Sequence, residues 1–251
     1  FKYRADAAED VLEHIDLRIE SGSTVGILGG TGSGKSSLVQ LIARLYDATE
    51  GAVLVGGRDV RDYDLATLRD AVGIVLQKNV LFTGTVRENL QWGNPQASDD
   101  ELLAACRAAC VDEFLDRIGG LDGELGQGGA GVSGGQKQRL CIARTLLKHP
   151  RVLIFDDSTS AVDMAIDAKI REHIARISDT TVLIIAQRIA SVMDADRIVV
   201  LDDGRVHGVG THEELLRSCP AYLEIAQSQL SAEELGLTQE EIAAVMEGGE
   251  R

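Results

Sequence analysis

A glycine-rich stretch near the start of the chain constrains its fold more than any other feature. An apolar run over residues 25–28 leads into it, and apolar residues at helical spacing follow it over 37–43. The stretch consists of Gly29, Gly30, Thr31, Gly32, Ser33, Gly34, Lys35 and Ser36. A glycine loop between a strand and a helix lets backbone N–H groups turn toward phosphate oxygens. The pattern predicts a nucleoside triphosphate site, and a merely flexible Gly/Ser loop is the less favoured interpretation.

The polar side chains that close this loop have the chemistry that such a site needs. Lys35 offers a positive charge to the outer phosphates, and Ser36 offers a hydroxyl to Mg²⁺. We also expect Ser37, the next residue, to bind the nucleotide. These residues therefore predict a nucleoside triphosphate and Mg²⁺ as the bound groups.

Composition excludes several classes of protein. The 251 residues carry a formal net charge of −15 and show no basic patch, which disfavours a nucleic-acid partner. The sequence shows no signal peptide and no apolar run near the roughly 18 residues of a membrane span. The four cysteines form no C-x-x-C pair, so we expect buried thiols in a reducing compartment rather than a metal site. The chain starts at Phe1 without Met, and we expect it to be a piece of a longer protein.

Several short, fully apolar runs indicate a parallel sheet. Runs over 152–155, 182–186 and 198–201 lie between helical stretches, as buried parallel strands do. Ligands bind at the carboxyl ends of such strands. The positions directly after predicted strands are Gly29, Gln77, Asp156 and Gln187. The sequence thus predicts one site built at these strand ends.

Antiparallel structure is expected near the start of the chain. Apolar residues at 15, 17 and 19 alternate with charged ones, which predicts a half-buried strand, and residues 51–57 read as another strand and turn. Past residue 228 there are six acidic residues and one basic residue, so we expect a loosely attached acidic tail of short helices. The helix-capping pairs predicted along the chain are Ser98–Glu101, Thr211–Glu214, Ser231–Glu234 and Thr238–Glu241.

One further stretch carries a resemblance to a known family. Residues 133–139, which precede the apolar run ending at Asp156, resemble the signature motif of ATP-binding-cassette (ABC) transporters. The resemblance runs in family order from the start of the chain to about residue 228. Residues 75–82 and 84–89 are similar to the exporter branch of the family, and residues 160–163 resemble its D-loop.

The resemblance implies a fold, partners and a location. It implies an α/β P-loop ATPase core with a mainly parallel sheet, an N-terminal antiparallel β subdomain and a helical subdomain. The ATPase domain is expected over 1–228, with its helical part at about 84–145, and the acidic tail over 229–251. The implied partners are a second ABC nucleotide-binding domain and the transmembrane domain of the same parent polypeptide. The chain itself is expected to be soluble, at the cytoplasmic face of the cell membrane.

The resemblance also implies roles for individual residues. Tyr3 is expected to stack on adenine, although it could simply be a strand aromatic. Asp156 is expected to hold Mg²⁺ with Ser36, and Gln77 to reach the metal and the attacking water. The signature is expected to contact the nucleotide held by the partner domain through Ser133, Gly134, Gly135 and Gln136. The residues expected to act in catalysis are Lys35, Gln77, Asp157 and Gln187.

This chain departs from the family pattern at three positions. The residue after Asp156 is normally glutamate, the base that polarises water, and here it is Asp157. The switch position is normally histidine, and here Gln187 can donate a hydrogen bond but carries no charge. An acidic residue that normally faces the membrane helices is replaced by Gln127.

Two altered catalytic positions beside intact ATP-binding residues favour a specific hypothesis. The chain's own site binds ATP and hydrolyses it slowly, while its intact signature completes an active site on a different partner chain. The alternatives are an active homodimer that uses Asp157 and a regulatory ATP-binding module with negligible hydrolysis. A soluble ABC ATPase of DNA repair or translation and the separate ATPase of an importer fit less well, because the former carry long insertions or tandem cassettes and the latter lacks the exporter-like motifs.

Overall fold

The computed structural model describes residues 1–4, 6–157, 162–177 and 179–248. These residues fall into two units, one formed by 1–4 and 6–65 with 182–248, and the other by 66–157, 162–177 and 179–181. Residues 160 and 161 of the predicted D-loop lie outside the described residues.

The first unit is built on four neighbouring strands of a mainly parallel sheet. Strand β1 (Thr24–Leu28) lies between β8 (Thr181–Ala186) and β9 (Arg197–Asp202) and is parallel to both. Strand β10 (Arg205–Gly210) turns back antiparallel to β9. The apolar runs of β1, β8 and β9 are buried, as their continuous hydrophobicity predicts.

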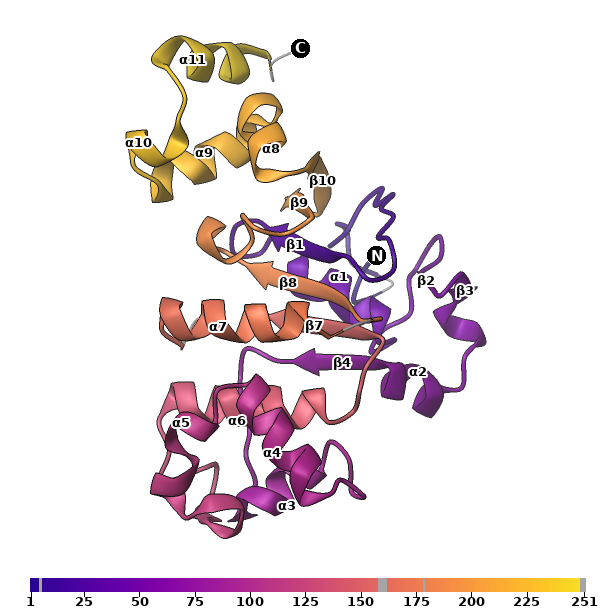
Figure 1. Ribbon diagram of the computed structural model, residues 1–251. Helices are drawn as coiled ribbons and strands as arrows, with labels where there is room; N and C mark the ends of the chain where they lie inside the picture. The colour runs from indigo at the N-terminus through magenta and orange to yellow at the C-terminus, as the bar shows by residue number, and fades with distance from the viewer. Residues whose placement is uncertain (5, 158–161, 178, 249–251) are drawn as a thin grey trace. The chain divides into compact units, whose positions relative to one another are not determined.

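Helices accompany these strands, and side-chain caps mark where three of them, α8 (His212–Ser218), α10 (Ala232–Leu235) and α11 (Gln239–Gly248), begin. Helix α1 (Lys35–Ile42) follows the glycine loop, and the 3₁₀ helix η4 (Ile189–Ser191) follows β8. Helices α8 (His212–Ser218) and α9 (Pro220–Gln229) lie beside β10 and β9 (Figure 1). The tail forms α10 (Ala232–Leu235) and α11 (Gln239–Gly248), and α11 contacts α8 and α9. The predicted capping pairs at Thr211, Ser231 and Thr238 are present.

The antiparallel part at the start of the chain is smaller than predicted. Strands β2 (Leu54–Val55) and β3 (Arg58–Asp59) form a hairpin, and the 3₁₀ helix η1 (Val60–Asp62) follows. The strand predicted over residues 15–19 is not formed, and that prediction is wrong. The side chains of residues 15–19 do alternate between half-buried and exposed. The alternating sequence pattern therefore identified a partly buried face correctly, but these residues do not form a strand.

The second unit carries two parallel strands with helices packed around them. Strand β4 (Val72–Val75) pairs in register with β7 (Val152–Asp156). Helix α2 (Leu65–Ala71) leads into β4, α6 (Gly134–Leu146) packs against β4, and α7 (Met164–Ala175) follows β7.

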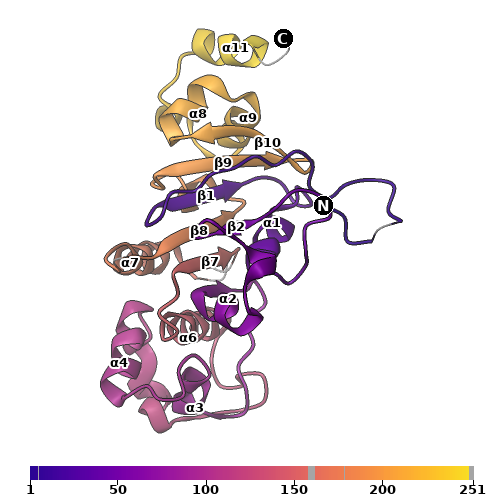
Figure 2. The same ribbon diagram turned by 90° about the vertical axis from the view of Figure 1, so that its right-hand side faces the viewer.

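Two further helices of this unit lie beside α6 (Figure 2). Helices α3 (Val86–Gln91) and α4 (Asp99–Ala108) contact α6 directly, and the predicted Ser98–Glu101 capping box begins α4. The short elements between α4 and α6 are α5 (Asp112–Leu115), η2 (Asp116–Ile118), η3 (Gly120–Asp122) and β6 (Glu124–Leu125), of which β6 pairs with β5 (Gly84–Thr85). The boundaries predicted at 84–145 and at 228 remain predictions.

All four cysteines are free and buried, as expected. Burial raises the pKa of Cys106 to about 12, so this thiol stays protonated near neutral pH. Among the described residues, no helix combines the length and the apolar character that a membrane span requires.

Candidate functional site

The glycine loop between β1 and α1 adopts a conformation that requires glycine at several positions. Gly32 and Gly34 have φ values of 87° and 94°, in the left-handed region. A Cβ atom on Gly29 would lie 2.0 Å from the carbonyl oxygen of Leu201. The loop therefore turns tightly at the N-terminus of α1, and a helix N-terminus attracts the negative charge of phosphate.

Lys35, the first residue of α1, points back into this loop. Its side chain is buried, and Nζ donates hydrogen bonds to the carbonyl oxygens of Gly29 at 2.8 Å and Gly30 at 2.5 Å. Nζ also lies 3.2 Å from the hydroxyl oxygen of Ser33. No acidic residue stands in the first turn of α1. A buried cation beside a helix N-terminus fits the phosphates of a nucleotide.

Tyr3 lies beside this loop in the same unit. Its hydroxyl and that of Ser37 form a hydrogen bond of 2.6 Å, so the structure brings together two residues that the sequence had placed in the site. Tyr3 remains 46% exposed, and its ring is available to a ligand. The structure adds Phe1 and Tyr46, whose rings contact Tyr3 and which the sequence analysis missed.

In the second unit, two strand ends bring Gln77 and Asp157 together. Gln77 follows β4 and Asp157 follows β7, and these strands are neighbours. The Nε2 atom of Gln77 donates a hydrogen bond of 3.2 Å to Oδ2 of Asp157. Asp156 beside them is buried. Asp157 has a φ of 46°, a conformation that aspartate tolerates better than most residues.

The signature residues begin helix α6. Ser133 is its N-cap: Oγ accepts from the Gln136 backbone N–H at 3.3 Å, and the Ser133 N–H donates to Oε1 of Gln136 at 2.8 Å. Gly134 and Gly135 form the first turn. Ser133 and Gly134 are exposed, so this helix N-terminus is accessible to a ligand.

Gln187 follows β8 and is held by a residue that the sequence analysis did not single out. The side chain of Gln229, at the end of α9, donates from Nε2 to the carbonyl oxygen of Gln187 at 2.8 Å. Its Oε1 accepts from the backbone N–H of Ile189, also at 2.8 Å. One side chain thus fixes the backbone on both sides of Arg188. No local pattern signals such a contact, because 42 residues separate the two glutamines.

Replacing Gln229 with alanine should loosen this segment. We expect amide hydrogen exchange at Ile189 to rise about two- to tenfold, since a hydrogen bond of this kind contributes roughly 0.5–1.5 kcal/mol. Residue-resolved hydrogen exchange measures this directly. Ser228→Ala is the matched control, because the Ser228 hydroxyl bonds only within α9 in the described contacts, to the carbonyl of Ile225. Unchanged protection at Ile189 in Gln229→Ala would contradict the clamp.

The residues predicted to hold Mg²⁺ belong to different units. Ser36 is in the first unit, and Gln77 and Asp156 are in the second. Hydroxyl, amide and carboxylate oxygens are the donors that Mg²⁺ prefers, so the chemistry of this set fits the ion. The described residues contain no cluster of three or more His, Cys, Asp or Glu side chains suited to a metal. The shared role of the three residues stays a prediction.

An aromatic pocket of about 290 Å³ lies in the second unit. Phe82 and Trp92 stack with ring centroids 4.9 Å apart, and both side chains are exposed. Asn89 holds the backbone of Phe82: its side chain accepts a hydrogen bond from the Phe82 N–H at 2.8 Å and donates one to the Phe82 carbonyl at 2.9 Å. Val80, also exposed, completes an apolar rim.

Comparison with known proteins decides the family. Residues 12–160 match the family described as ABC transporter. This chain belongs to the ABC transporter family. The chain is 39% identical to a bacterial Atm1-family ABC exporter with ATP bound, with a TM-score of 0.87 over 92% of this chain and 41% of that one. It is thus an ABC nucleotide-binding domain of the exporter type, and the predicted α/β P-loop fold is confirmed.

Curated relatives of this nucleotide-binding domain point the same way. An uncharacterized ABC transporter ATP-binding protein of Mycobacterium tuberculosis is 46% identical over 87% of this chain and 38% of its own length. A multidrug efflux ATP-binding/permease protein of Mycobacterium bovis is 44% identical over 90% and 19%. A putative multidrug export ATP-binding/permease protein of Staphylococcus aureus is 42% identical over 88% and 39%. The chain spans about two fifths or less of the length of these relatives.

Proposed function

We propose that this nucleotide-binding domain binds and hydrolyses Mg·ATP to power an exporter, with a slow site of its own. One observation carries the proposal. Asp157 and Gln187 stand where the family pattern has glutamate and histidine, while the glycine loop and the signature are intact. Intact nucleotide-binding residues beside two altered catalytic positions favour a site that holds ATP more than it hydrolyses it.

ATP binding is assigned to the glycine loop and its neighbours. Lys35 and the loop N–H groups hold the phosphates, and Tyr3 stacks on the adenine. Ser36, Gln77 and Asp156 are assigned to Mg²⁺, which would neutralise negative charge on the phosphates as the terminal bond breaks. The support for this assignment is the buried cation in the loop and the set of oxygen donors.

Slow hydrolysis is assigned to the short carboxylate of Asp157. Aspartate is one methylene shorter than glutamate, so its oxygens fall about 1 Å short of the same water, and such a displacement can lower a rate about a hundredfold. The hydrogen bond from Gln77 also engages one oxygen of this carboxylate. Gln187 adds a second loss, because a neutral amide stabilises charge developing on the transferred phosphoryl group less than a cation does.

The proposed partner is a second ABC nucleotide-binding domain, which this chain would meet through Ser133. In the capping box the Ser133 oxygen accepts a hydrogen bond, and its O–H can donate to a phosphate oxygen. Together with the N–H groups of Gly134 and Gly135, this makes the start of α6 suited to the terminal phosphate of a nucleotide that the partner holds. The partner with the full catalytic set would then turn over ATP while this chain completes its site.

The proposed attachment to membrane helices uses the aromatic pocket. Two of its exposed lining residues, Val80 and Phe82, belong to the segment 78–85, which follows Gln77, so an element seated there would respond to changes at the nucleotide. The exposed stack of Phe82 and Trp92 offers apolar area to a short helix of a transmembrane domain. ATP-binding/permease proteins among the relatives support such a domain in the parent polypeptide, with this domain at the cytoplasmic face of the cell membrane.

The test is phosphate release from Mg·ATP by the purified chain at increasing concentration, with ATP binding measured in parallel. We expect tight binding and almost no turnover at every concentration, since both composite sites of a homodimer would lack the glutamate and the histidine. Turnover per chain that climbs with concentration would instead establish an active homodimer. If the chain binds ATP tightly but shows no turnover even when mixed with an active partner domain, the remaining hypothesis is a regulatory ATP-binding module.

A further inference from the structure

Tyr3, the ring assigned to adenine, sits in a cluster of three aromatic side chains. Its centroid lies 5.0 Å from that of Phe1 and 4.9 Å from that of Tyr46, with interplanar angles of 76° and 83°. These are edge-to-face arrangements, which aromatic pairs favour. Neither neighbour stacks flat on Tyr3, and the ring keeps 46% of its surface exposed. The cluster therefore orients Tyr3 without covering it.

Tyr46 itself is on a loop, between α1 and β2, and is 45% exposed. A loop residue fixes another ring only if its own backbone is held. Arg44 and Asp47, which flank Tyr46 in the sequence, bond to each other: Nε of Arg44 donates to Oδ1 of Asp47 at 2.8 Å. A side-chain contact thus links a residue on each side of Tyr46.

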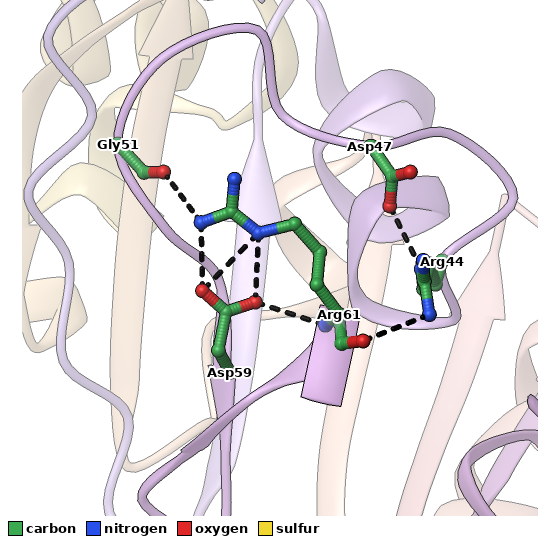
Figure 3. A network of polar contacts seen from close by, with 5 residues as sticks. All are labelled: Arg44, Asp47, Gly51, Asp59 and Arg61. Carbon is green, nitrogen blue, oxygen red and sulfur yellow. Dashed lines mark hydrogen bonds and ion pairs between the residues drawn. The ribbon is translucent and has the colours of Figure 1, made fainter. Parts of the chain in front are cut away.

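A second set of contacts ties this loop to the hairpin region (Figure 3). Arg61 donates from its guanidinium to the carbonyl oxygen of Gly51 at 3.1 Å, at the far end of the loop. The carbonyl oxygen of Arg61 accepts from Arg44 at 3.2 Å, at the near end. One residue therefore holds both ends of the loop that carries Tyr46.

Arg61 is in turn fixed by Asp59. The carboxylate of Asp59 accepts from NH2 of Arg61 at 2.7 Å, from its Nε at 3.1 Å and from its backbone N–H at 2.9 Å. Hydrogen bonds from Arg61 hold the pKa of Asp59 at about 2, so the pair stays charged at any pH used for nucleotide binding. A bidentate guanidinium–carboxylate pair has a defined geometry, which a single contact lacks.

We propose that Tyr46, held in place by the Arg61 network, is a positioning residue for Tyr3 and so sets how tightly the base of a nucleotide is bound. This inference rests on the proposed adenine contact of Tyr3. It assigns base affinity to a brace that extends from Asp59 through Arg61 and the 44–51 loop to Tyr46. It predicts that damage to the brace weakens binding of the base and leaves binding of the phosphates unchanged.

The experiment compares equilibrium binding of Mg·ATP with that of Mg·tripolyphosphate, which lacks ribose and base. We expect Tyr46→Ala to weaken ATP binding about three- to tenfold, because an aromatic pair contributes roughly 0.5–1.5 kcal/mol beyond its buried area. Tripolyphosphate binding should not change. Tyr46→Phe should bind ATP like the parent chain, and Arg61→Gln should weaken ATP about two- to threefold, since exposed ion pairs contribute less than about 1 kcal/mol.

Two further variants separate the possible failures. Arg58→Gln is the matched control, because Arg58 lies on the same hairpin but its described contacts are with Tyr63 and Asp62, and its ATP affinity should not change. Tyr3→Ala should weaken ATP binding about tenfold, in line with base–aromatic stacking.

If Tyr3→Ala weakens ATP binding and Tyr46→Ala does not, the brace is refuted and the adenine contact stands. If neither weakens ATP, the adenine contact itself is wrong. Equal losses for ATP and tripolyphosphate in Tyr46→Ala would overturn the brace as general damage to the fold.

Discussion

Replacing Asp157 with glutamate is expected to raise the rate of ATP hydrolysis at this chain's own site by about a hundredfold, because the longer side chain restores a reach of about 1 Å toward the attacking water. Adding Gln187→His should raise the rate further, since imidazole can carry a positive charge beside the terminal phosphate. The measurement is phosphate release at saturating Mg·ATP by the parent chain, each single variant and the double variant. All four should bind ATP with similar affinity.

The backbone conformation at position 157 is expected to make the Asp157→Glu variant less stable than the parent chain. Asp157 has a φ of 46°, and aspartate enters the left-handed region more readily than glutamate does. We expect Asp157→Glu to lower the free energy of unfolding by roughly 1 kcal/mol, which denaturant titration measures. Asp157→Asn is the control for both effects, because it keeps the size and the backbone preference but removes the carboxylate.

The outcome distinguishes the two main hypotheses for this site. A large gain from Asp157→Glu means that the native aspartate limits hydrolysis, as the proposal requires. A parent chain that already hydrolyses ATP rapidly, and that Asp157→Asn inactivates, would mean that aspartate is an adequate base. The asymmetric hypothesis would then be wrong, and an active homodimer would replace it.

Features that depend on neighbours in the sequence were predicted well. Hydrogen bonds and burial are local in these features, so a few neighbouring residues specify each of them. They are the glycine loop, the strands around 72–75 and 152–156, and the capping boxes at Ser98 and Ser231. The strand predicted at 15–19 was wrong because strand formation also depends on residues far away in the sequence. Alternation records which side chains are half-buried, whereas a strand also needs a partner, and the partner is set by the rest of the fold.

Contacts between distant parts of the chain account for what the sequence could not predict. Gln229 lies 42 residues from the carbonyl that it binds, and Tyr46 is 43 positions after the ring that it orients. Neither residue type is unusual in its place, because glutamine at a helix end and tyrosine in a loop are ordinary. The left-handed backbone of Asp157 likewise has no signal in its neighbours, and it bears directly on whether glutamate is tolerated there.

The second large effect is expected at Ser133, in a pair of domains that hydrolyse ATP across their interface. Ser133→Asp keeps a side chain that caps α6 well but sets a negative charge against the terminal phosphate held by the other domain. We expect turnover at that composite site to fall at least about a hundredfold, as when a donor to a developing oxyanion is removed. Binding of ATP to this chain's own glycine loop should not change.

A mixed pair built from this chain alone isolates that site. One member carries Asp157→Glu and Gln187→His together with Ser133→Asp, so it offers a repaired glycine-loop site and a disabled signature. The other member is the parent chain, which keeps its own glycine-loop site, proposed to be slow, and an intact Ser133. Only the repaired site completed by the parent's Ser133 can then turn over ATP rapidly, and each member alone should be slow.

Loss of helix capping must be separated from loss of a phosphate contact. Ser98 provides the matched control, because it caps α4 through the same reciprocal contacts, with Glu101 in place of Gln136. Ser98→Ala and Ser133→Ala should each lower the free energy of unfolding by about 1 kcal/mol. Only Ser133→Ala and Ser133→Asp in the otherwise parent member should abolish rapid turnover of the mixed pair. If turnover survives both Ser133 changes, the signature does not act on the partner's nucleotide, and the proposal that this chain completes another domain's site is refuted.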